Sequence, residues 1–430
     1  MESGGYNTPS GWNAVARNRI AGKRMQRDLK VRFLVIGAGF AGLAIARRLA
    51  TRYPDETIAL VDAQEPAQNS SGRNSGFMIN LPFAKIRANS SSDQNQWQTR
   101  IMSMGQQLLE KTVAQYEINC DWHTVGHYKV ATTKYGVAQL QQLRQTLVAN
   151  RIKYRALSTG DILQELGTSH YRDAIWLSQC SLVQPAELVH GLISSLPQNV
   201  ESYFACPVSG ISDNNPHVVQ AGKSEIRAET VFLAVNALLP QFGYAKYRQL
   251  AMYTYAGLSR PLGEQYCHLL GDQEQWGVTP VEQLEATSRK TVDNRLLLRA
   301  GFSYKTELAD DQVRRVLQEK LQARYPDAPA NMFEHVWGGA VSLTRNGEAV
   351  LGQLGRRLYG VSGCNASGIL KMTALGTLLA DMACGVGSPL LQETRIHCRP
   401  SFIPPEPFRT VAVNLNLQKL KKQLQPYHGE

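Results

Sequence analysis

Three glycines and one acid near the start of the chain have the spacing of a dinucleotide-binding site. Gly37, Gly39 and Gly42 lie in VIGAGFAGLAIARRLA at 35–50, and Asp62 follows twenty residues after Gly42. In such a motif the first glycine permits a tight turn, the second lets the backbone approach the phosphates, and the third lets the helix pack on the sheet. The acid would hold the ribose hydroxyls, which favours FAD or NAD over NADP.

A strand, a helix and a second strand must position these residues. VRFLVIGAG at 31–39 is an apolar run suited to a buried parallel strand, AGLAIARRLA at 41–50 has helical spacing, and TIALVDA at 57–63 is a second apolar run. Free N–H groups and a partial positive charge at the start of the helix attract a pyrophosphate. This order predicts a βαβ unit in which Phe40 and Ala41 also approach the cofactor and Ala63 lies beside the acid.

A polar run after the second strand separates a flavin enzyme from a nicotinamide dehydrogenase. NSSGRNSGFMIN occupies 69–80, where a nicotinamide dehydrogenase would normally begin another crossover helix. Serine, glycine and asparagine supply hydrogen-bond donors with little bulk, which suits a long ligand lying along the chain. The alternative is a plain surface loop, which would not be expected to end in the apolar GFMI. The run therefore favours a flavin.

The strand and glycine patterns of a nucleotide-binding domain return twice later in the chain. HVVQAG and SEIRAETVFLAVNA predict a hairpin that feeds a central strand, and a glycine-rich part begins at 335. We predict an α/β plus α+β fold, with a Rossmann-type FAD-binding domain and a discontinuous antiparallel-sheet substrate domain. The predicted boundaries are 31–90, 181–245 and 335–395 for the FAD-binding domain, 91–180 and 246–334 for the substrate domain, 1–30 for a basic N-terminal tail, and 396–430 for a C-terminal tail with a short basic helix. Helical spacing marks 100–118, 135–165, 310–325 and 373–384.

Seven motifs resemble, in order, those of the D-amino-acid-oxidase-like FAD oxidoreductases. The resemblance covers about 31–390 and is nearest to the γ-glutamylputrescine oxidoreductase and L-pipecolate oxidase branch. The motifs are GAGFAGL, VDA, SGRNSG, QPAELVHGL, VFLAVNA, WGGAVSLTRNGEAVLG and YGVSGCNASGILKMTALGTLLADMACG.

The resemblance implies the reaction and the residues around the cofactor. The amine of a small amino acid, favoured as a secondary or cyclic amine like L-pipecolate, is oxidised to an imine by hydride transfer to flavin N5, and O2 or a respiratory acceptor reoxidises the flavin. Alternatives are a γ-glutamylputrescine-type or D-amino-acid amine oxidase. The cofactor-binding residues implied beyond the glycine turn are Ser71, Arg73, Asn74, Ser75, Gly76, Val208, Asn236, Gly363, Ser367, Gly368, Ile369 and Leu370.

The chain departs from its relatives at two places. Sarcosine oxidase carries a flavin-linking cysteine shortly before the threonine that resembles Thr344, but here that stretch is AVSLT. We therefore expect non-covalent FAD. Sarcosine oxidase also has a carboxylate-binding lysine two residues after the glycine that resembles Gly368. Here Leu370 holds that position and Lys371 follows, so Lys371 is either a substrate contact or a solvent-facing helix residue.

Substrate contacts are expected from the tyrosine-rich strands. Tyr253 and Tyr255 share one face of AMYTYAG by the period of two. Arg299 and Tyr304 lie in RAGFSY, and Arg299 could clamp a carboxylate. The alternative for each is core packing. No obligatory base is expected, because flavin oxidation of an amine needs mainly a neutral nitrogen and correct placement.

Charge and cysteine usage limit the class of protein. The chain has 430 residues, a net charge of +11 and seven cysteines, none of them in a CxxC pair. We expect reduced thiols, no metal site and a cytoplasmic protein, since we find no secretory signal and no spanning apolar run. The basic residues at 17–32 are expected to form a solvated arm, with attraction to an anionic membrane as the alternative and no nucleic acid as partner.

Two further hypotheses remain open. The C-terminal stripe of Val413, Leu417, Leu420 and Leu424 either packs back on the protein or docks on a membrane surface. A different class of function would be an FAD protein that acts on RNA, or serves a larger complex, through its basic tails. The oligomeric state is not indicated.

Overall fold

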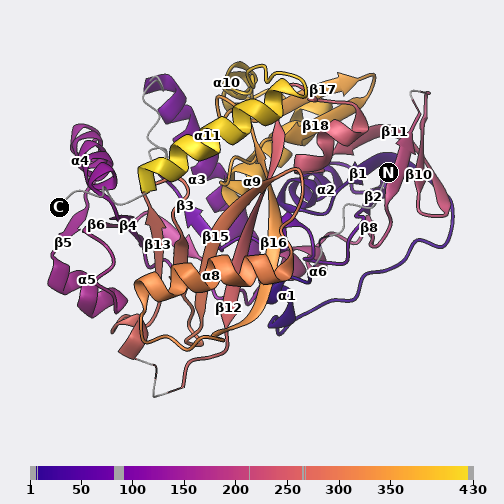
Figure 1. Cartoon of the computed structure of the whole chain (residues 1–430). Helices are drawn as coiled ribbons and strands as arrows, with labels where there is room; N and C mark the ends of the chain where they lie inside the picture. The colour runs from indigo at the N-terminus through magenta and orange to yellow at the C-terminus, as the bar shows by residue number, and fades with distance from the viewer. Residues whose placement is uncertain are drawn as a thin grey trace.

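The computed structural model of the chain describes residues 6, 8–81, 92–212, 214–263, 266 and 268–424. Two large sheets and the helices packed on them organise these residues (Figure 1). Six cysteines of the described part are free. Among the helices of the described residues, none combines the length and the apolar character needed to cross a bilayer.

The first sheet carries the glycine motif. Its order is β17-β18-β11-β1-β2-β8, with the β9–β10 hairpin added on β11. β1 lies between β11 and β2 and is parallel to both, and its second half, Phe33 to Ile36, is apolar and buried, as is usual in a parallel sheet. The strands are β1 (Leu29–Ile36), β2 (Ile58–Val61), β8 (Val200–Tyr203), β9 (Val208–Ile211), β10 (His217–Ala221), β11 (Ser224–Leu233), β17 (Val350–Gly355) and β18 (Leu358–Ser362).

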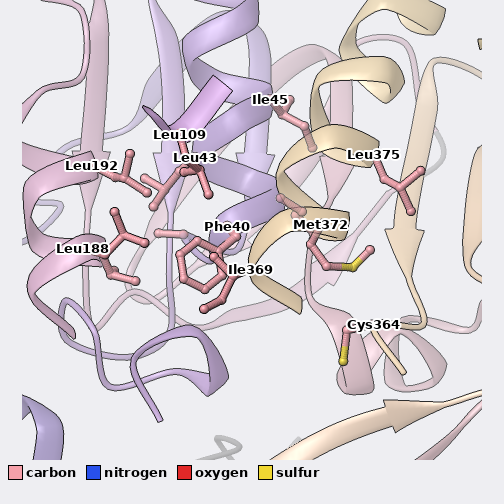
Figure 2. Close-up of a cluster of buried hydrophobic side chains, with 14 of the residues drawn as sticks. Phe40, Leu43, Ile45, Leu109, Leu188, Leu192, Cys364, Ile369, Met372 and Leu375 are labelled. Atoms are coloured by element: carbon pink, nitrogen blue, oxygen red, sulfur yellow. The ribbon is translucent and has the colours of Figure 1, made fainter. Parts of the chain in front are cut away.

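A helical core covers this sheet. Helix α2 packs on α9, because Gly376 of α9 lets the two backbones meet: a Cβ there would lie 2.4 Å from the Ala41 oxygen. Figure 2 shows Phe40 of α2 beside Ile369 of α9, with Leu188 of α6 nearby. The helices are α2 (Phe40–Arg52), α3 (Ser92–Gln115), α6 (Pro185–Ser194), α9 (Gly368–Ala383) and α10 (Pro389–His397).

The second sheet has two faces with different neighbours. Its order is β16-β12-β15-β14-β13-β4-β6-β5, antiparallel except between β13 and β4. One face packs on α8 (Asp310–Arg324), which Figure 1 shows lying across it, and the other face meets the nucleotide domain. The strands are β4 (His127–Ala131), β5 (Arg155–Leu157), β6 (Asp173–Leu177), β12 (Leu250–Ser259), β13 (Trp276–Pro280), β14 (Thr287–Lys290), β15 (Leu296–Tyr304) and β16 (Phe333–Leu343).

Shorter elements complete the chain. Helices α4 and α5 flank the far end of the second sheet, and β3 pairs with β7 as a separate two-stranded sheet. The bounds are α1 (Gly11–Ala14), α4 (Lys134–Ala149), α5 (Thr159–Leu166), α11 (Phe408–Leu424), β3 (Phe77–Ile79), β7 (Cys180–Leu182), and the 3-10 helices η1 (Ser70–Gly72), η3 (Asn236–Phe242) and η4 (His268–Leu270).

The predicted fold class is confirmed, with corrections to its parts. Helix α3 belongs to the nucleotide-domain core through Trp97, Ile101 and Leu109, although it was assigned to the substrate domain. Strand β16 continues the substrate sheet to Leu343, beyond the predicted boundary at 335. The helix predicted over 135–165 is two helices, because β5 interrupts them.

The two predicted tails are partly packed. Ser10, Trp12 and Ala16 are buried, so this part of the predicted tail 1–30 packs on the protein, whereas the basic side chains at 17–32, predicted to be solvated, are mostly exposed. In α11 the stripe Val413, Leu417, Leu420 and Leu424 is half-buried, as expected for a helix that packs back on the protein. Its outer side exposes Phe408, Val411 and Leu415.

A buried ion pair fixes α8 to the second sheet and should dominate stability there. Glu285 accepts from Arg324 at 2.6 Å and from Lys320 at 2.9 Å, and Glu285 and Arg324 are 5% and 2% exposed. Replacing Glu285 with Gln leaves the Arg324 charge buried and uncompensated, so we expect a loss of about 3–5 kcal/mol in the free energy of unfolding. Denaturant titration at pH 7 measures it.

The control and the pH dependence follow from the same geometry. Glu229→Gln removes an exposed pair with Arg357 and should cost under about 1 kcal/mol. Burial by itself raises the pKa of the Glu285 carboxyl. The positive charges of Arg324 and Lys320 lower it by more, so the pKa is about 2. Because this pKa lies below the ordinary value, the stabilisation is complete above about pH 4.5 and falls away toward pH 2. Equal losses in both variants would contradict the assignment.

Candidate functional site

The glycine turn has no room for side chains. Gly37 has φ +104°, and a Cβ on Gly42 would lie 1.7 Å from the Gly37 oxygen. Gly39 is the N-cap of α2 and supplies no side-chain cap, so the first turn of α2 keeps donors for an anion. The predicted arrangement of Gly37, Gly39, Phe40, Ala41 and Gly42 between a buried strand and a helix is confirmed.

Asp62 ties the turn to the second strand. Its carboxylate accepts from Ala38 N at 2.7 Å, Gln64 N at 2.8 Å and Asn69 Nδ2 at 3.1 Å. Burial raises the pKa of this carboxyl, and the three hydrogen bonds act in the opposite direction. Asp62 and Ala63 therefore lie at the end of β2, where a ribose contact was predicted. That contact itself stays a prediction.

Loop 69–76 (Asn69 to Gly76) lies directly against the glycine turn. Ser71 Oγ accepts from Phe40 N at 3.1 Å, and a Cβ on Gly39 would lie 2.7 Å from the same oxygen. Arg73 is buried and donates to Gly338 O of β16 and to Gln68 O. Asn74 closes the loop on itself through Ser71 O and Gly76 N. The loop thus joins the two domains beside the helix N-terminus.

The late glycine-rich turn reaches the same place from the other end of the chain. Gly363, Asn365 and Ala366 all have positive φ, and Ser367 begins α9 without a side-chain cap. Because Phe40 and Ile369 pack together, the N-termini of α2 and α9 converge (Figure 2). Ile369 and Leu370 bury their side chains in the core. The backbone N–H groups of Ser367, Gly368, Ile369 and Leu370 are therefore the groups of this turn that a cofactor could reach.

Two predicted residues from the middle of the chain join these turns. Val208 begins β9, two residues after Cys206. The backbone N–H of Cys206 donates to the backbone carbonyl oxygen of Asp62. Asn236 has φ +43°, and its Nδ2 donates to Cys364 Sγ at 3.5 Å. The structure therefore brings Val208 to the Asp62 end of the site and Asn236 to the late turn.

A row of four side chains crosses the face of the second sheet that meets the nucleotide domain. Trp337 of β16 pairs with Ala256 of β12, Ala256 with Arg299 of β15, and Arg299 with Thr287 of β14. Trp337 and Ala256 belong to the nucleotide-domain core. Trp337 Nε1 donates to Arg73 O at 3.0 Å, so loop 69–76 reaches this row.

Arg299 is a half-buried cation without an acidic partner among the described residues. Its guanidinium donates to Thr254 Oγ1 at 3.1 Å and Thr287 Oγ1 at 2.8 Å, and it lies 5.3 Å from the centre of the Phe302 ring. Burial lowers its pKa to about 10, which still leaves it charged at neutral pH. A desolvated guanidinium held only by hydroxyls can take a carboxylate in bidentate fashion.

The predicted tyrosines are not gathered around Arg299. Tyr253 and Tyr255 do share one face, but it is the face toward α8, where Tyr255 is buried and its hydroxyl bonds Ser303 and Leu308 N. For Tyr255 the structure favours core packing over substrate contact. Tyr304 lies at the end of β15, and its hydroxyl donates to Glu406 at 2.9 Å.

Lys371 is not the solvent-facing helix residue that one alternative expected, and its substrate contact stays a prediction. It is 8% exposed, so it is not solvent-facing, and its charge acts on Cys398 after α10. The helix α9 directs it to that side because Lys371 lies two residues from Ile369, which packs toward α2.

Sequence reasoning missed three residues that organise the site: Trp12, Arg289 and Trp337. Trp12 Nε1 donates to Asn74 O, and Arg289 donates to Ser75 O. Burial lowers the pKa of Arg289 to about 10, and no acid pairs with it among the described residues. A tryptophan inside an otherwise polar, basic segment was the available signal for Trp12.

These residues fit FAD. Glycines without room for Cβ, two helices whose N-cap residues supply no side-chain cap, and a loop of small polar residues lie between Asp62 and the late turn. When bound there, FAD supplies a two-electron acceptor for a carbon–hydrogen bond next to nitrogen. Two buried guanidiniums, of Arg73 and Arg289, and the half-buried guanidinium of Arg299 would favour added negative charge nearby.

Comparisons with known proteins agree with this site. The family model "FAD dependent oxidoreductase" matches residues 32–382. The chain is 25% identical over 387 residues to γ-glutamylputrescine oxidoreductase of Escherichia coli (strain K12), which covers 87% of this chain and 89% of that protein. Glycine oxidase from Geobacillus kaustophilus has a TM-score of 0.72 at 19% identity, covering 84% of this chain and 96% of that one.

A third similar structure is L-proline dehydrogenase from P. horikoshii, with a TM-score of 0.64 at 16% identity over 86% of this chain and all of that one (100%). These likenesses in structure concern the fold, whereas the family model covers most of the sequence. The chain belongs to the FAD-dependent oxidoreductase family.

Proposed function

We propose that the protein oxidises a small amino acid with a secondary or cyclic amine, of the L-pipecolate type, to the imine. The observation that carries the proposal is Arg299, a half-buried guanidinium on the cofactor-side face that has hydroxyl partners and no acidic partner among the described residues. A substrate carboxylate would supply the missing charge. The substrate amine would then lie on the side of the row nearer loop 69–76.

The surroundings of Arg299 favour a compact, partly apolar substrate. Phe302 lies beside the guanidinium, and a small side chain, Ala256, separates Arg299 from Trp337 in the row. Ring methylenes next to a carboxylate would pack on these side chains. The likeness in fold to a protein named L-proline dehydrogenase is in keeping with a cyclic secondary amine. No acid–base residue is required if the amine binds neutral.

An anaerobic substrate screen tests the proposal. Holoenzyme is mixed with L-pipecolate, L-proline, sarcosine, glycine, D-amino acids and γ-glutamylputrescine, and bleaching of the flavin absorbance is followed. The fastest bleaching is expected with a cyclic L-amino acid. If γ-glutamylputrescine or a D-amino acid bleaches the flavin faster, the corresponding alternative replaces the proposal. Release of all flavin by acid precipitation would support non-covalent binding.

An RNA-directed function receives less support. Arg17, Arg24, Arg27 and Arg32 each form an ion pair with an acid elsewhere in the chain. These pairs reduce the positive charge that the segment presents to a polyanion. A small-molecule amine therefore remains the favoured substrate.

Peripheral membrane contact is a prediction for the outer side of α11. Phe408, Val411 and Leu415 are 67%, 55% and 61% exposed, and lysines follow toward the end of the helix. Replacing all three with Ser should abolish co-sedimentation with anionic vesicles at low salt, because the apolar contact is lost. Vesicles of neutral lipid are the control, and unchanged co-sedimentation would contradict the contact.

A further inference from the structure

The N-terminal segment, here Tyr6 and residues 8–20, is bonded directly to loop 69–76. Ser10 Oγ donates to Gly72 O at 2.8 Å, and Trp12 Nε1 donates to Asn74 O at 2.8 Å. Tyr6 adds a hydroxyl contact of 2.6 Å to Ser70 Oγ. The segment therefore touches the loop at three places.

The carbonyl oxygens of the loop show how completely it is held. Each of the five consecutive oxygens from Gly72 to Gly76 accepts from a different residue elsewhere in the chain. In order, the donors are Ser10 Oγ, Trp337 Nε1, Trp12 Nε1, Arg289 Nη1 and Val183 N, at 2.8, 3.0, 2.8, 3.3 and 3.0 Å. Two of these five bonds come from the N-terminal segment.

Arg73 gives the segment a further hold on the loop. Its Nη2 donates to Thr8 O at 2.7 Å, and its guanidinium lies 3.9 Å from the centre of the Tyr6 ring. The arginine stacks on the tyrosine while its other nitrogens hold Gln68 O and Gly338 O. The loop, the segment and strand β16 are thereby joined through one side chain.

The segment is itself anchored on α6. Gln184 Nε2 donates to Trp12 O at 2.8 Å, and Ile20 N donates to His190 Nδ1 at 3.3 Å. His190 therefore carries its proton on Nε2 and donates to Asn13 Oδ1 at 2.6 Å. Burial lowers the pKa of this histidine, which keeps it neutral. Trp12, 2% exposed, fills the space between Trp337 and Arg289.

A loop of serine, glycine and asparagine has much conformational freedom to lose when a ligand orders it. Bonds that order it during folding remove that cost from ligand binding and raise affinity. The family model begins at residue 32, so the segment lies outside the part of the chain that the model matches.

We propose that the N-terminal segment is a positioning element for the cofactor: it preorganises loop 69–76 so that FAD binds tightly and in one orientation. The proposal rests on the proposed placement of that loop along FAD. Ser10 and Trp12 are positioning residues that act through the loop backbone and do not need to touch the flavin.

The test uses full-length protein with Ser10→Ala and Trp12→Phe combined. Phenylalanine keeps most of the buried ring and removes the indole donor. The double variant should bind FAD about 10- to 30-fold more weakly in a flavin-fluorescence titration of apoprotein, the change expected for two neutral hydrogen bonds. The visible circular dichroism of the bound flavin should change, and the melting temperature of the apoprotein should stay close to that of the parent.

Three further variants separate the explanations. Ser10→Thr keeps a hydroxyl and should restore affinity when it replaces Ser10→Ala. Arg27→Ala, in an exposed ion pair further along the chain, should leave affinity unchanged. Ser71→Ala removes the loop hydroxyl that faces the glycine turn, and it should also weaken FAD binding.

The outcomes are distinguishable. Unchanged FAD affinity in the double variant, with weaker binding in Ser71→Ala, overturns the positioning role and leaves the loop placement intact. Unchanged affinity in both overturns the placement as well as the positioning role. A lower melting temperature of the apoprotein with unchanged FAD affinity marks the segment as structural only and also overturns the proposal.

Discussion

Replacing Arg299 with Met should raise the KM for a carboxylate substrate and lower kcat/KM by about 100- to 1,000-fold, the loss expected when a buried charged hydrogen-bond pair is broken. The guanidinium is held by Thr254 and Thr287, which leaves its charge for the ligand. An amine that resembles the substrate but lacks the carboxylate should be oxidised equally by both enzymes. Steady-state kinetics with the two substrates measure the difference.

The stability of the same variant gives an independent readout. A partly desolvated guanidinium without a counter-charge costs desolvation free energy, so Arg299→Met should leave the melting temperature unchanged or raise it. A purely structural arginine would instead lower it. Tyr255→Phe is the matched control: Tyr255 sits one residue away from Ala256 on the opposite face and should keep kcat/KM within about threefold. An unchanged KM in Arg299→Met would refute the carboxylate role.

The cofactor end of the site could be predicted because its residues are local in sequence. Gly37 to Gly42 and Asp62 form one βαβ unit, and the spacing within it fixes their relation. Loop 69–76 follows immediately and is equally contiguous. The late turn was recognised from its motif, but only the packing of Phe40 on Ile369 brings it to the same place.

The arrangement of the predicted substrate-contact residues depends on strand pairings that a sequence does not specify. The period of two correctly places Tyr253 and Tyr255 on one face, but it does not say which face meets the cofactor. The answer comes from α8, whose Val313, Leu317 and Leu321 pack against the tyrosine face. Arg299 was identified by its type, whereas its row with Trp337 requires the register of three strands.

The N-terminal segment shows that composition alone does not predict which residues are buried. Its charge predicts solvent exposure, and the arginines are indeed exposed. Composition averages over residues, however, and Ser10 and Trp12, which precede the arginines, are buried because each finds a carbonyl partner in loop 69–76. A buried indole with a satisfied N–H is a specific contact that no average charge reveals.

Replacing Gly42 with Ala should abolish tight FAD binding while much of the fold survives. The added Cβ would lie 1.7 Å from the Gly37 oxygen and 2.9 Å from its carbonyl carbon, both backbone atoms that cannot rotate away. The turn must therefore move off α2, and the N–H groups that would meet the pyrophosphate move with it. Losing one charged hydrogen bond to phosphate weakens binding on the order of 10- to 100-fold, and two are at risk.

Gly160→Ala provides the matched control for this change. Gly160 also lies near the start of a helix, α5, but its Cβ would lie 3.7 Å from Ser158 Oγ, an ordinary contact, and alanine favours the helix. FAD content after purification and fluorescence titration of both apoproteins measure the effect, and far-UV circular dichroism reports the fold. Gly42 lies in α2, on the first sheet, whereas Arg299 lies in β15 of the second sheet. Gly42→Ala loaded with flavin at saturating FAD should therefore keep its KM for substrate. Equal FAD affinity in Gly42→Ala and Gly160→Ala would show that the turn does not carry the pyrophosphate.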